Sequence, residues 1–201
     1  VRVAPSINIK LYIMLALVLF FVIGCCGAVL LGRLSDIVDY LLYVDKKTGL
    51  PNREKLNIYI GEMAGKVLPE AFTCFTLSLD NLSELTKRFG YTVGDGVLKD
   101  FAGLVQLMGD TEGMRGYNGI GRFVVFFEEC SSKKAAAMIR ILDNQVEEYN
   151  SLNPEYPIRY TAAWATTEET DTYEIRELLR LSQKKWKQME KEKKDKTEEE
   201  T

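Results

Sequence analysis

An uncharged apolar segment near the start of the chain restricts its fold more than any other feature. Residues 11–32, LYIMLALVLFFVIGCCGAVLLG, contain no charged side chain. A helix of that length extends over about 33 Å, which is enough to cross the hydrocarbon core of a bilayer. The segment therefore predicts a single membrane-spanning helix, preceded by a short N-terminal flank at residues 1–10.

The charges beside this segment indicate its orientation. Basic residues are more frequent after it than before it, and cytoplasmic flanks carry the excess of Lys and Arg. These residues are Arg2 and Lys10 before the segment, and Arg33, Lys46, Lys47, Arg53 and Lys55 after it. We therefore expect a single-pass protein of the cell membrane with its C-terminal part in the cytoplasm. The stretch 22–25 also resembles a lipoprotein cleavage box, but the apolar run continues well past Cys25.

The membrane segment and the linker after it both carry patterns that favour self-association. Gly24, Ala28 and Gly32 are spaced four apart, which lets two membrane helices approach closely, although such helices are rich in small residues anyway. In the linker, residues 33–44, apolar side chains recur at 3-4-3 spacing over two heptads. They are Leu34, Ile37, Leu41 and Val44. The linker is either the seam of a homodimer or an amphipathic helix resting on its own domain.

The chain as a whole has a globular composition, and a series of alternating predicted elements begins at residue 45. Hydrophobic residues make up 46% of the whole chain and charged residues 27%. Apolar periodicity and turn residues predict the order β-α-α-β-β-α-β-α, an α+β, ferredoxin-like arrangement of a sheet with packed helices. The expected strands are 71–79, 114–117, 123–127 and 158–165, and the expected helices are 52–65, 82–90, 93–108, one capped by Ser132 and one after Thr172. The helix capped by Ser132 is expected to have an apolar face made of Met138, Ile141, Leu142, Val146 and Tyr149. The charged end, residues 191–201, is expected to be a frayed, solvated tail.

Composition also excludes several function classes. The chain has no histidine, which excludes histidine triads, histidine metal ligands and the usual near-neutral proton shuttle. Its four cysteines do not have metal-ligand spacing, and we expect neither a metal nor another cofactor. A net charge of −3 without a basic, aromatic patch argues against nucleic-acid binding.

Three stretches resemble the motifs of GGDEF domains, the bacterial diguanylate cyclase family. DKKTGLPNR, residues 45–53, is similar to the D-x-L-T-G-L-x-N-R opening, with Lys47 in place of Leu. LSLDNLSELTKRFGYTVGDGVL, residues 77–98, is similar to the segment D-x-D-x-F-K-x-x-N-x-x-x-G-H-x-x-G-D, and GIGRF, residues 119–123, falls where G-G-D-E-F should be. The resemblance covers residues 45–190. It implies a nucleotidyl-cyclase-like fold and a cytoplasmic domain whose dimer condenses two GTP into cyclic di-GMP.

The resemblance also implies that the metal site is lost. In the family, the first Asp of D-x-D and an acid of the signature hold Mg²⁺, and the Glu that follows is needed for catalysis. Here those positions carry Ser78, Gly121 and Arg122, and Asp80 remains only at the second Asp of D-x-D. A cation about 4 Å from a divalent ion repels it by about 8 kcal/mol at an effective dielectric near 20. We therefore expect a protein that is not an enzyme.

The nucleotide-binding positions are only partly kept. The family's guanine-reading Asn falls on Thr86, and its partner Asp is Asp95, which either still accepts from a guanine or caps a helix that begins at Gly96. Arg122 is either an exposed arginine paired with Asp80 or a phosphate partner that replaces the metal. The vestigial nucleotide-binding residues are thus Asp80, Thr86, Asp95 and Arg122.

Two further family positions have also changed. The product-inhibition motif Arg-x-x-Asp falls on Asp110 and Gly113, so it is absent. The phosphate-facing Lys near the C-terminus falls on Met189, and Trp186 keeps only the packing role of the family's Tyr.

The sequence therefore supports two functions of different kinds. The first is a membrane-anchored, catalytically inactive GGDEF-like domain that acts in signalling through dimerisation or a protein partner. The alternative is a metal-independent receptor for GTP or a related purine nucleotide.

Overall fold

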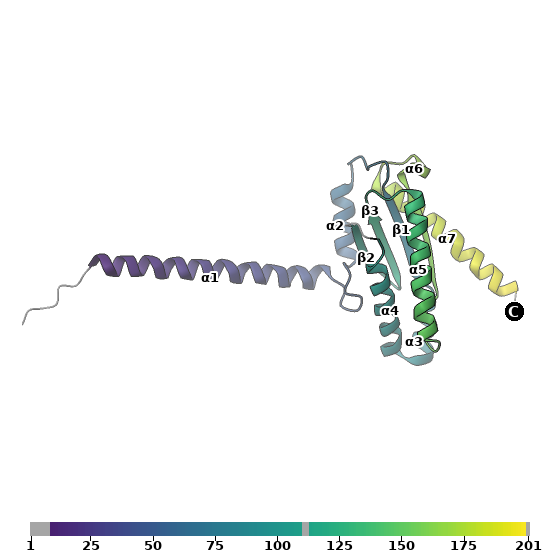
Figure 1. The fold of residues 1–201 in the computed structure, drawn as a ribbon, viewed down its shortest axis with the longest axis horizontal. Coiled ribbons are helices and arrows are strands. Elements are labelled where there is room, and N and C mark those ends of the chain that lie inside the picture. The colour runs from purple at the N-terminus through teal and green to yellow at the C-terminus, as the bar shows by residue number, and fades with distance from the viewer. Residues whose placement is uncertain (1–8, 110–112, 200–201) are drawn as a thin grey trace, which may run out of the picture. The chain divides into compact units, whose positions relative to one another are not determined.

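The computed structural model describes residues 9–109 and 113–199, and the chain divides into two units on either side of the Leu42–Tyr43 bond. Residues 1–8 of the predicted flank, including Arg2, lie outside the described residues. Helix α1, Ile9–Tyr43, continues without interruption through the predicted membrane segment and almost all of the predicted linker (Figure 1). The linker is thus helical, as expected.

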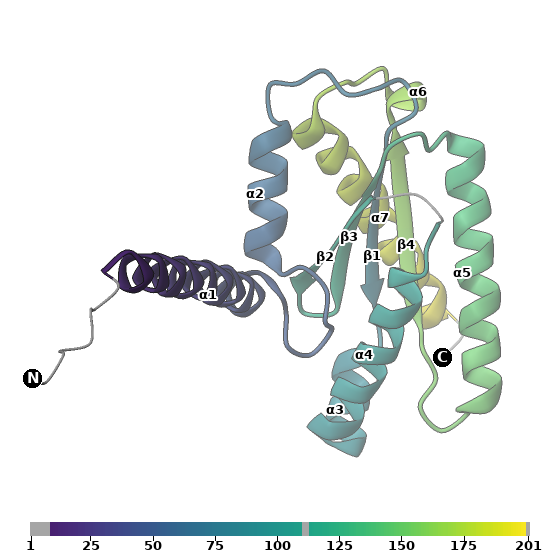
Figure 2. The same ribbon diagram turned by 60° about the vertical axis from the view of Figure 1, so that its left-hand side comes forward.

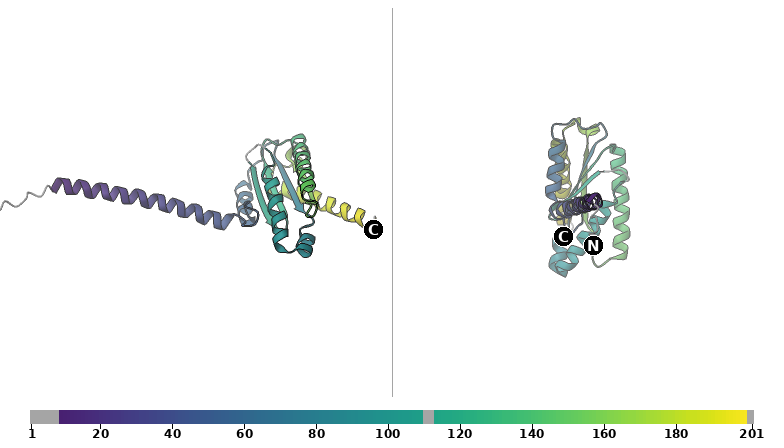
Figure 3. Two further views of the ribbon diagram at one scale, coloured as in Figure 1. Left: turned by 60° about the horizontal axis from the view of Figure 1, so that its bottom comes forward. Right: turned by 90° about the vertical axis from the view of Figure 1, so that its left-hand side faces the viewer.

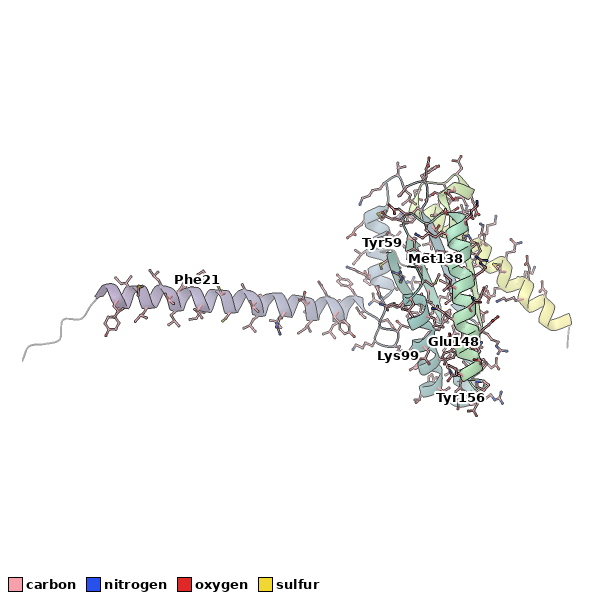
Figure 4. The ribbon with its side chains drawn as sticks, viewed as in Figure 1. Phe21, Tyr59, Lys99, Met138, Glu148 and Tyr156 are labelled. Carbon is pink, nitrogen blue, oxygen red and sulfur yellow. The ribbon has the colours of Figure 1, made fainter. Side chains whose placement is uncertain are left out.

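The side chains of α1 are exposed in this chain. Phe20 and Phe21 keep 78% and 71% of their surface, and Figure 4 shows Phe21 projecting away from the helix. By length and composition, Leu11–Tyr43 is the one helix of the described chain that could span a membrane, with a mean hydropathy of 2.9. The linker residues Leu34 and Ile37 are more than half exposed.

A four-stranded antiparallel sheet forms the centre of the second unit, in the order β2-β3-β1-β4. The strands are β1 Thr73–Leu79, β2 Gly113–Gly119, β3 Arg122–Phe127 and β4 Tyr160–Thr166. All four correspond to predicted strands, and the predicted α+β order is confirmed. In the register, Ser78 of β1 lies opposite Arg122 on one side and Thr161 on the other.

Helices cover both faces of this sheet. In Figure 2 and the right-hand view of Figure 3, α2 and α7 lie on one side of the sheet and α5 on the other, and in Figure 2 α4 lies on the α5 side. The helices of this unit are α2 Arg53–Met63, α3 Leu82–Phe89, α4 Tyr91–Gln106, α5 Ser132–Leu152, α6 Thr167–Thr170 and α7 Ile175–Glu199.

The alternation of side chains along β1 accounts for these two layers. Successive side chains of a strand point to opposite faces, and every residue of β1 is buried. Phe75 and Leu77 belong to the core beneath α4 and α5, whereas Cys74 belongs to the core beneath α2 and α7. On the second face, the Ser182 hydroxyl of α7 lies 2.8 Å from the Thr76 hydroxyl, which fixes α7 against β1.

Three local expectations were wrong. Ser131, not Ser132, caps α5, since its hydroxyl accepts from the Lys134 backbone N–H. Ile141, expected on the apolar face of that helix, is 57% exposed. The charged end is not frayed within the described chain, because α7 continues to Glu199. Side-chain pairs three or four residues apart can support a polar helix of this kind, and Gln188 donates to Glu192.

Candidate functional site

A cleft of about 1210 Å³ opens where β1 ends. Its walls come from the end of β1, helix α3, the β2–β3 turn, the start of β4 and the second half of α7. The sequence-predicted residues Asp80, Thr86 and Arg122 all line it, and Asp95 does not. The structure therefore brings three of the four predicted site residues together.

The β2–β3 turn forms the lip of this cleft. Ile120 and Gly121 have φ values of +53° and +70°, so both adopt the left-handed conformation of a tight hairpin turn. Gly121 suits that backbone, but Ile120 is β-branched and strained there, and it is 88% exposed. The Gly121 carbonyl accepts from the Leu79 backbone N–H at 2.8 Å, which ties the turn to the end of β1.

Arg122, the first residue of β3, is held by an aromatic ring. Its guanidinium carbon lies 4.8 Å from the centre of the Trp186 ring, and Trp186 is only 3% exposed. Trp186 lies one helical turn beyond Ser182, the residue that fixes α7 to β1. A cation over a tryptophan ring is attracted by the face of the ring, and the N–H groups of a guanidinium point outward in the guanidinium's own plane. Trp186 thus has the packing role that its position predicts.

Asp80 contacts other partners than the expected one. Its Oδ2 accepts a hydrogen bond from the Thr161 hydroxyl at 2.7 Å and lies 3.8 Å from the Lys193 ammonium. Lys193 also donates to the Tyr160 carbonyl at 2.7 Å. The predicted pairing of Asp80 with Arg122 was therefore wrong, because a lysine of α7 and a threonine of β4 hold the carboxylate while Trp186 holds the arginine.

Thr86 lies at the edge of the cleft, but its hydroxyl is used within the protein. The Thr86 Oγ1 donates to the Leu82 carbonyl at 2.8 Å, one turn earlier in α3. A Cβ added to Gly94 would lie 2.3 Å from that same oxygen, so α3 and α4 approach each other closely here. This hydroxyl is part of a helix–helix contact.

Asp95 lies outside the cleft and does not cap a helix. Helix α4 begins at Tyr91, which places Asp95 in its second turn. Its Oδ1 instead accepts from the Lys47 ammonium at 2.8 Å, and this hydrogen bond is the main reason that the pKa of Lys47 is raised. The prediction of an Asp95 cap was wrong because the helix starts earlier than the glycines suggested.

The turn that carries Lys47 is built by Asp45. The Asp45 Oδ1 accepts from the backbone N–H groups of Lys47 and Thr48 at 3.1 and 2.9 Å, and from the Thr48 hydroxyl at 2.9 Å. Gly49 then takes a φ of +71°, which glycine adopts without strain. The opening motif thus folds into a compact turn that presents Lys47 to α4.

Sequence reasoning missed Lys193, which was assigned to the charged tail. The signal was its helical spacing, since Glu190 and Lys193 follow Trp186 by four and seven residues and all three line the cleft. Lys47 was noticed only as a departure from the family motif. Its partner is 48 residues away, a separation that no local pattern reveals.

The positions aligned with the family's metal ligands lie near the end of β1 and in the β2–β3 turn. Ser78 is buried, and a Cβ added to Gly121 would lie 3.1 Å from the Leu79 carbonyl oxygen. The described residues contain no group of three or more His, Cys, Asp or Glu side chains that could hold a metal ion. Of the two positions aligned with the product-inhibition motif, Asp110 lies outside the described residues and Gly113 begins β2. Met189, which is aligned with the family's phosphate-facing Lys, is 41% exposed.

Comparison with known proteins identifies the domain. The family described as "Diguanylate cyclase, GGDEF domain" matches residues 42–196. A diguanylate cyclase/phosphodiesterase from Caldicellulosiruptor saccharolyticus is similar in structure with a TM-score of 0.58, at 19% identity, over 76% of this chain and 91% of that one. The search of curated proteins gave no match.

Two other solved structures share the fold. The coiled coil and GGDEF domain of DgcB from Caulobacter crescentus, in complex with c-di-GMP, has a TM-score of 0.61 at 15% identity, over 75% of this chain and 82% of that one. The FimX GGDEF domain from Pseudomonas aeruginosa has a TM-score of 0.57 at 18% identity, over 71% of this chain and 90% of that one. At these identities the likeness concerns the fold.

Proposed function

Because the chain belongs to the diguanylate cyclase GGDEF domain family, we propose that it is a membrane-anchored signalling module whose GGDEF domain does not make cyclic di-GMP. The observation that carries the proposal is the pairing of Ser78 with Arg122 across β1 and β3, where the family resemblance leads us to expect acids. The proposal concerns both the chemistry of the cleft and the role of α1.

The loss of catalysis follows from charge. Phosphoryl transfer depends on divalent cations that neutralise the triphosphate and activate the attacking hydroxyl. Magnesium is held by anionic oxygens in a near-octahedral arrangement. Ser78 supplies a neutral hydroxyl, Gly121 supplies no side chain, and Arg122 adds a fixed positive charge that Trp186 keeps at this end of the sheet. A site of this composition repels the ion that the reaction needs.

The guanine-reading positions have acquired structural roles. Asp95 is engaged by Lys47, and the Thr86 hydroxyl is engaged by the Leu82 carbonyl. Lys47 occupies the position where the family motif has Leu. Its partner Asp95 is the one carboxylate that this chain keeps at the family's guanine-reading positions. This pairing supports a role for Asp95 in joining the turn at residues 45–53 to α4.

Helix α1 supports the membrane-anchored part of the proposal. It is long and apolar enough to cross a bilayer, and it continues as a helix into the linker. Leu34, Ile37 and Leu41 are exposed along that linker at heptad spacing. In a dimer they would be covered by the same residues of a second copy, with the GGDEF domains on the cytoplasmic side.

The proposal is tested with the full chain reconstituted into lipid nanodiscs. The protein is incubated with GTP and Mg²⁺, and cyclic di-GMP is measured by mass spectrometry. We expect none above a protein-free control, while tryptophan fluorescence melting shows that the preparation is folded. Cyclic di-GMP formed in proportion to protein would refute the loss of catalysis. Release of the chain from membranes by alkaline carbonate would refute the anchoring.

A further inference from the structure

The cleft contains a cation that no acid of the described chain neutralises. Arg122 lines the cleft and is exposed, and among the described residues no carboxylate lies within ion-pair distance of it. Its contact is with Trp186, because the guanidinium carbon lies over the face of that ring. A guanidinium fixed in this way presents its N–H edge to a ligand, and that edge matches the oxygens of a phosphate.

Other cations of the cleft are already paired. Arg159 forms an ion pair with Glu84, and Lys193 lies 3.8 Å from Asp80. Lys87 of α3 also lines the cleft, and it is exposed, with no ion pair to a described acid. The four cations that line the cleft, Lys87, Arg122, Arg159 and Lys193, outnumber its three acids, Asp80, Glu84 and Glu190, by one, and neither Arg122 nor Lys87 has an ion pair with a described acid.

A second observation also points to an absent acceptor. The Trp186 Nε1 is buried and has no hydrogen-bond partner in the described part of the chain. Buried N–H groups normally have a partner, so each exception requires an explanation. Trp186 also lines the cleft, so an oxygen of an anion that reaches the edge of its ring would give this N–H an acceptor.

The remaining wall of the cleft suits an organic group, and it lacks the Asn–Asp pair with which the resemblance implies that the family reads guanine. Ile120 and Tyr91 are 88% and 77% exposed and line the cleft together with Leu82. The Thr86 hydroxyl donates its hydrogen to the Leu82 carbonyl and so cannot donate to a ligand, and Asp95 lies outside the lining. Strong discrimination between similar ligands requires polar groups of the site that pair with one ligand and not with the other.

We propose that this cleft binds a phosphorylated small molecule through Arg122, without a divalent cation and without a preference for guanine. The inference rests on the proposed loss of the metal site, and it assigns to that site a ligand of different chemistry. The phosphate group binds the guanidinium edge, with Trp186 Nε1 as a second donor. The organic part lies against Ile120 and Tyr91.

The test uses the full chain in nanodiscs and isothermal titration calorimetry with GMP, AMP and inorganic phosphate, each in EDTA. We expect GMP and AMP to bind with dissociation constants within about tenfold of each other, because apolar contacts discriminate weakly. Replacing EDTA by Mg²⁺ should leave both constants unchanged. Inorganic phosphate measures the contribution of the anion without an organic part, and it should bind more weakly than either nucleotide.

Variants identify the residue responsible. Arg122→Gln should weaken AMP binding by about 10- to 100-fold, the range expected for hydrogen bonds to a charged group. Arg140→Gln, on the exposed face of α5, is the matched control and should bind as the wild type does. Trp186→Phe keeps a ring under Arg122 and removes the N–H, and it should weaken binding less than Arg122→Gln. Fluorescence melting through Trp164 shows that each variant is folded.

Three results would overturn the inference: no binding of either nucleotide, binding that requires Mg²⁺, or a large preference for GMP. Equal loss in Arg122→Gln and Arg140→Gln would also overturn it, because the effect would then be one of net charge. None of these results depends on cyclic di-GMP synthesis. Failure of the inference and failure of the proposed function can therefore be told apart.

Discussion

The contact between α3 and α4 makes a sharp prediction for Gly94→Ala. In an ordinary helix interior this change stabilises a protein by about 0.5–1 kcal/mol, since alanine loses less backbone freedom than glycine on folding. At this position the new Cβ would lie 2.3 Å from the Thr86 Oγ1 and 3.3 Å from its Cβ. Real Cβ atoms do not approach other atoms to 2.3 Å, so either the two helices move apart or the Thr86 side chain rotates away.

The expected cost has two parts. Overpacking a close contact destabilises a protein by about 1–3 kcal/mol. If the Thr86 side chain rotates away instead, its hydrogen bond to the Leu82 carbonyl is lost, at about 1 kcal/mol. After the helix-propensity gain is subtracted, we expect Gly94→Ala to lower the free energy of unfolding by about 1–2 kcal/mol. For a domain of this size that corresponds to a melting temperature lower by about 2–8 °C.

Tryptophan fluorescence melting measures this effect in the full chain. The chain has two tryptophans, Trp164 in β4 and Trp186 in α7, so the signal comes from the GGDEF unit and not from α1. Gly96→Ala is the matched control, because a Cβ added two residues along the same helix has nothing within 4 Å. It should raise the melting temperature while Gly94→Ala lowers it.

The reasoning is refuted if both variants are stabilised alike. The double variant Gly94→Ala with Thr86→Ala gives a second check, because it removes the oxygen responsible for the worst contact. It should recover part of the loss, and the Thr86 Cβ at 3.3 Å accounts for the part that remains. A purely additive double variant would show that these two residues do not limit the approach of the helices.

Two further predictions concern the cleft and the sheet edge. The double variant Ser78→Asp with Arg122→Glu should bind GTP in the presence of Mg²⁺, as measured by calorimetry, because it returns two carboxylates to facing positions on β1 and β3. If this variant does not bind GTP with Mg²⁺, the backbone around the site has diverged as well. The pKa of Tyr160 is raised by burial and by its hydrogen bond to Asp143, so the folded state keeps this phenol protonated where the unfolded chain ionises it. The stability from this group is therefore complete below about pH 10 and is lost as the pH rises further, and Tyr160→Phe should make the melting temperature fall less steeply between about pH 9 and 11. An unchanged slope would mean that other groups dominate alkaline unfolding.

Local sequence patterns were enough to predict most of the helices and strands. Strands β1, β3 and β4 are short runs rich in apolar or β-branched residues, and Gly90 ends α3 as the sequence suggests. Strand β2 is different, because three of its seven residues are glycines. The helix boundaries were less predictable where a glycine can mark either the start of a helix or a close contact between helices. Gly94 and Gly96 suggested a later start for α4, but the helix begins at Tyr91 and uses Gly94 for close packing. The packing role of Gly94 could not be predicted from the sequence, because it depends on where α3 lies.

Most of the site residues predicted from the sequence line the cleft, but the sequence did not predict which residues they contact. The motif alignment brought Asp80, Thr86 and Arg122 to one cleft. It could not place Asp95, since its partner Lys47 is distant in sequence and lies in a different motif. It also could not assign Arg122 to Trp186, because that contact depends on how far α7 extends over the sheet.

The β2–β3 turn keeps its shape although one of its two central residues is not a glycine. Its backbone is fixed by neighbours: the Leu79 N–H donates to the Gly121 carbonyl, and the Gly121 N–H donates to the Tyr117 hydroxyl at 3.2 Å. The side chain at position 120 therefore contributes little to building the turn. A substitution at this exposed position therefore changes the surface at the mouth of the cleft and leaves both of these hydrogen bonds in place, because they are made by the backbone of Gly121.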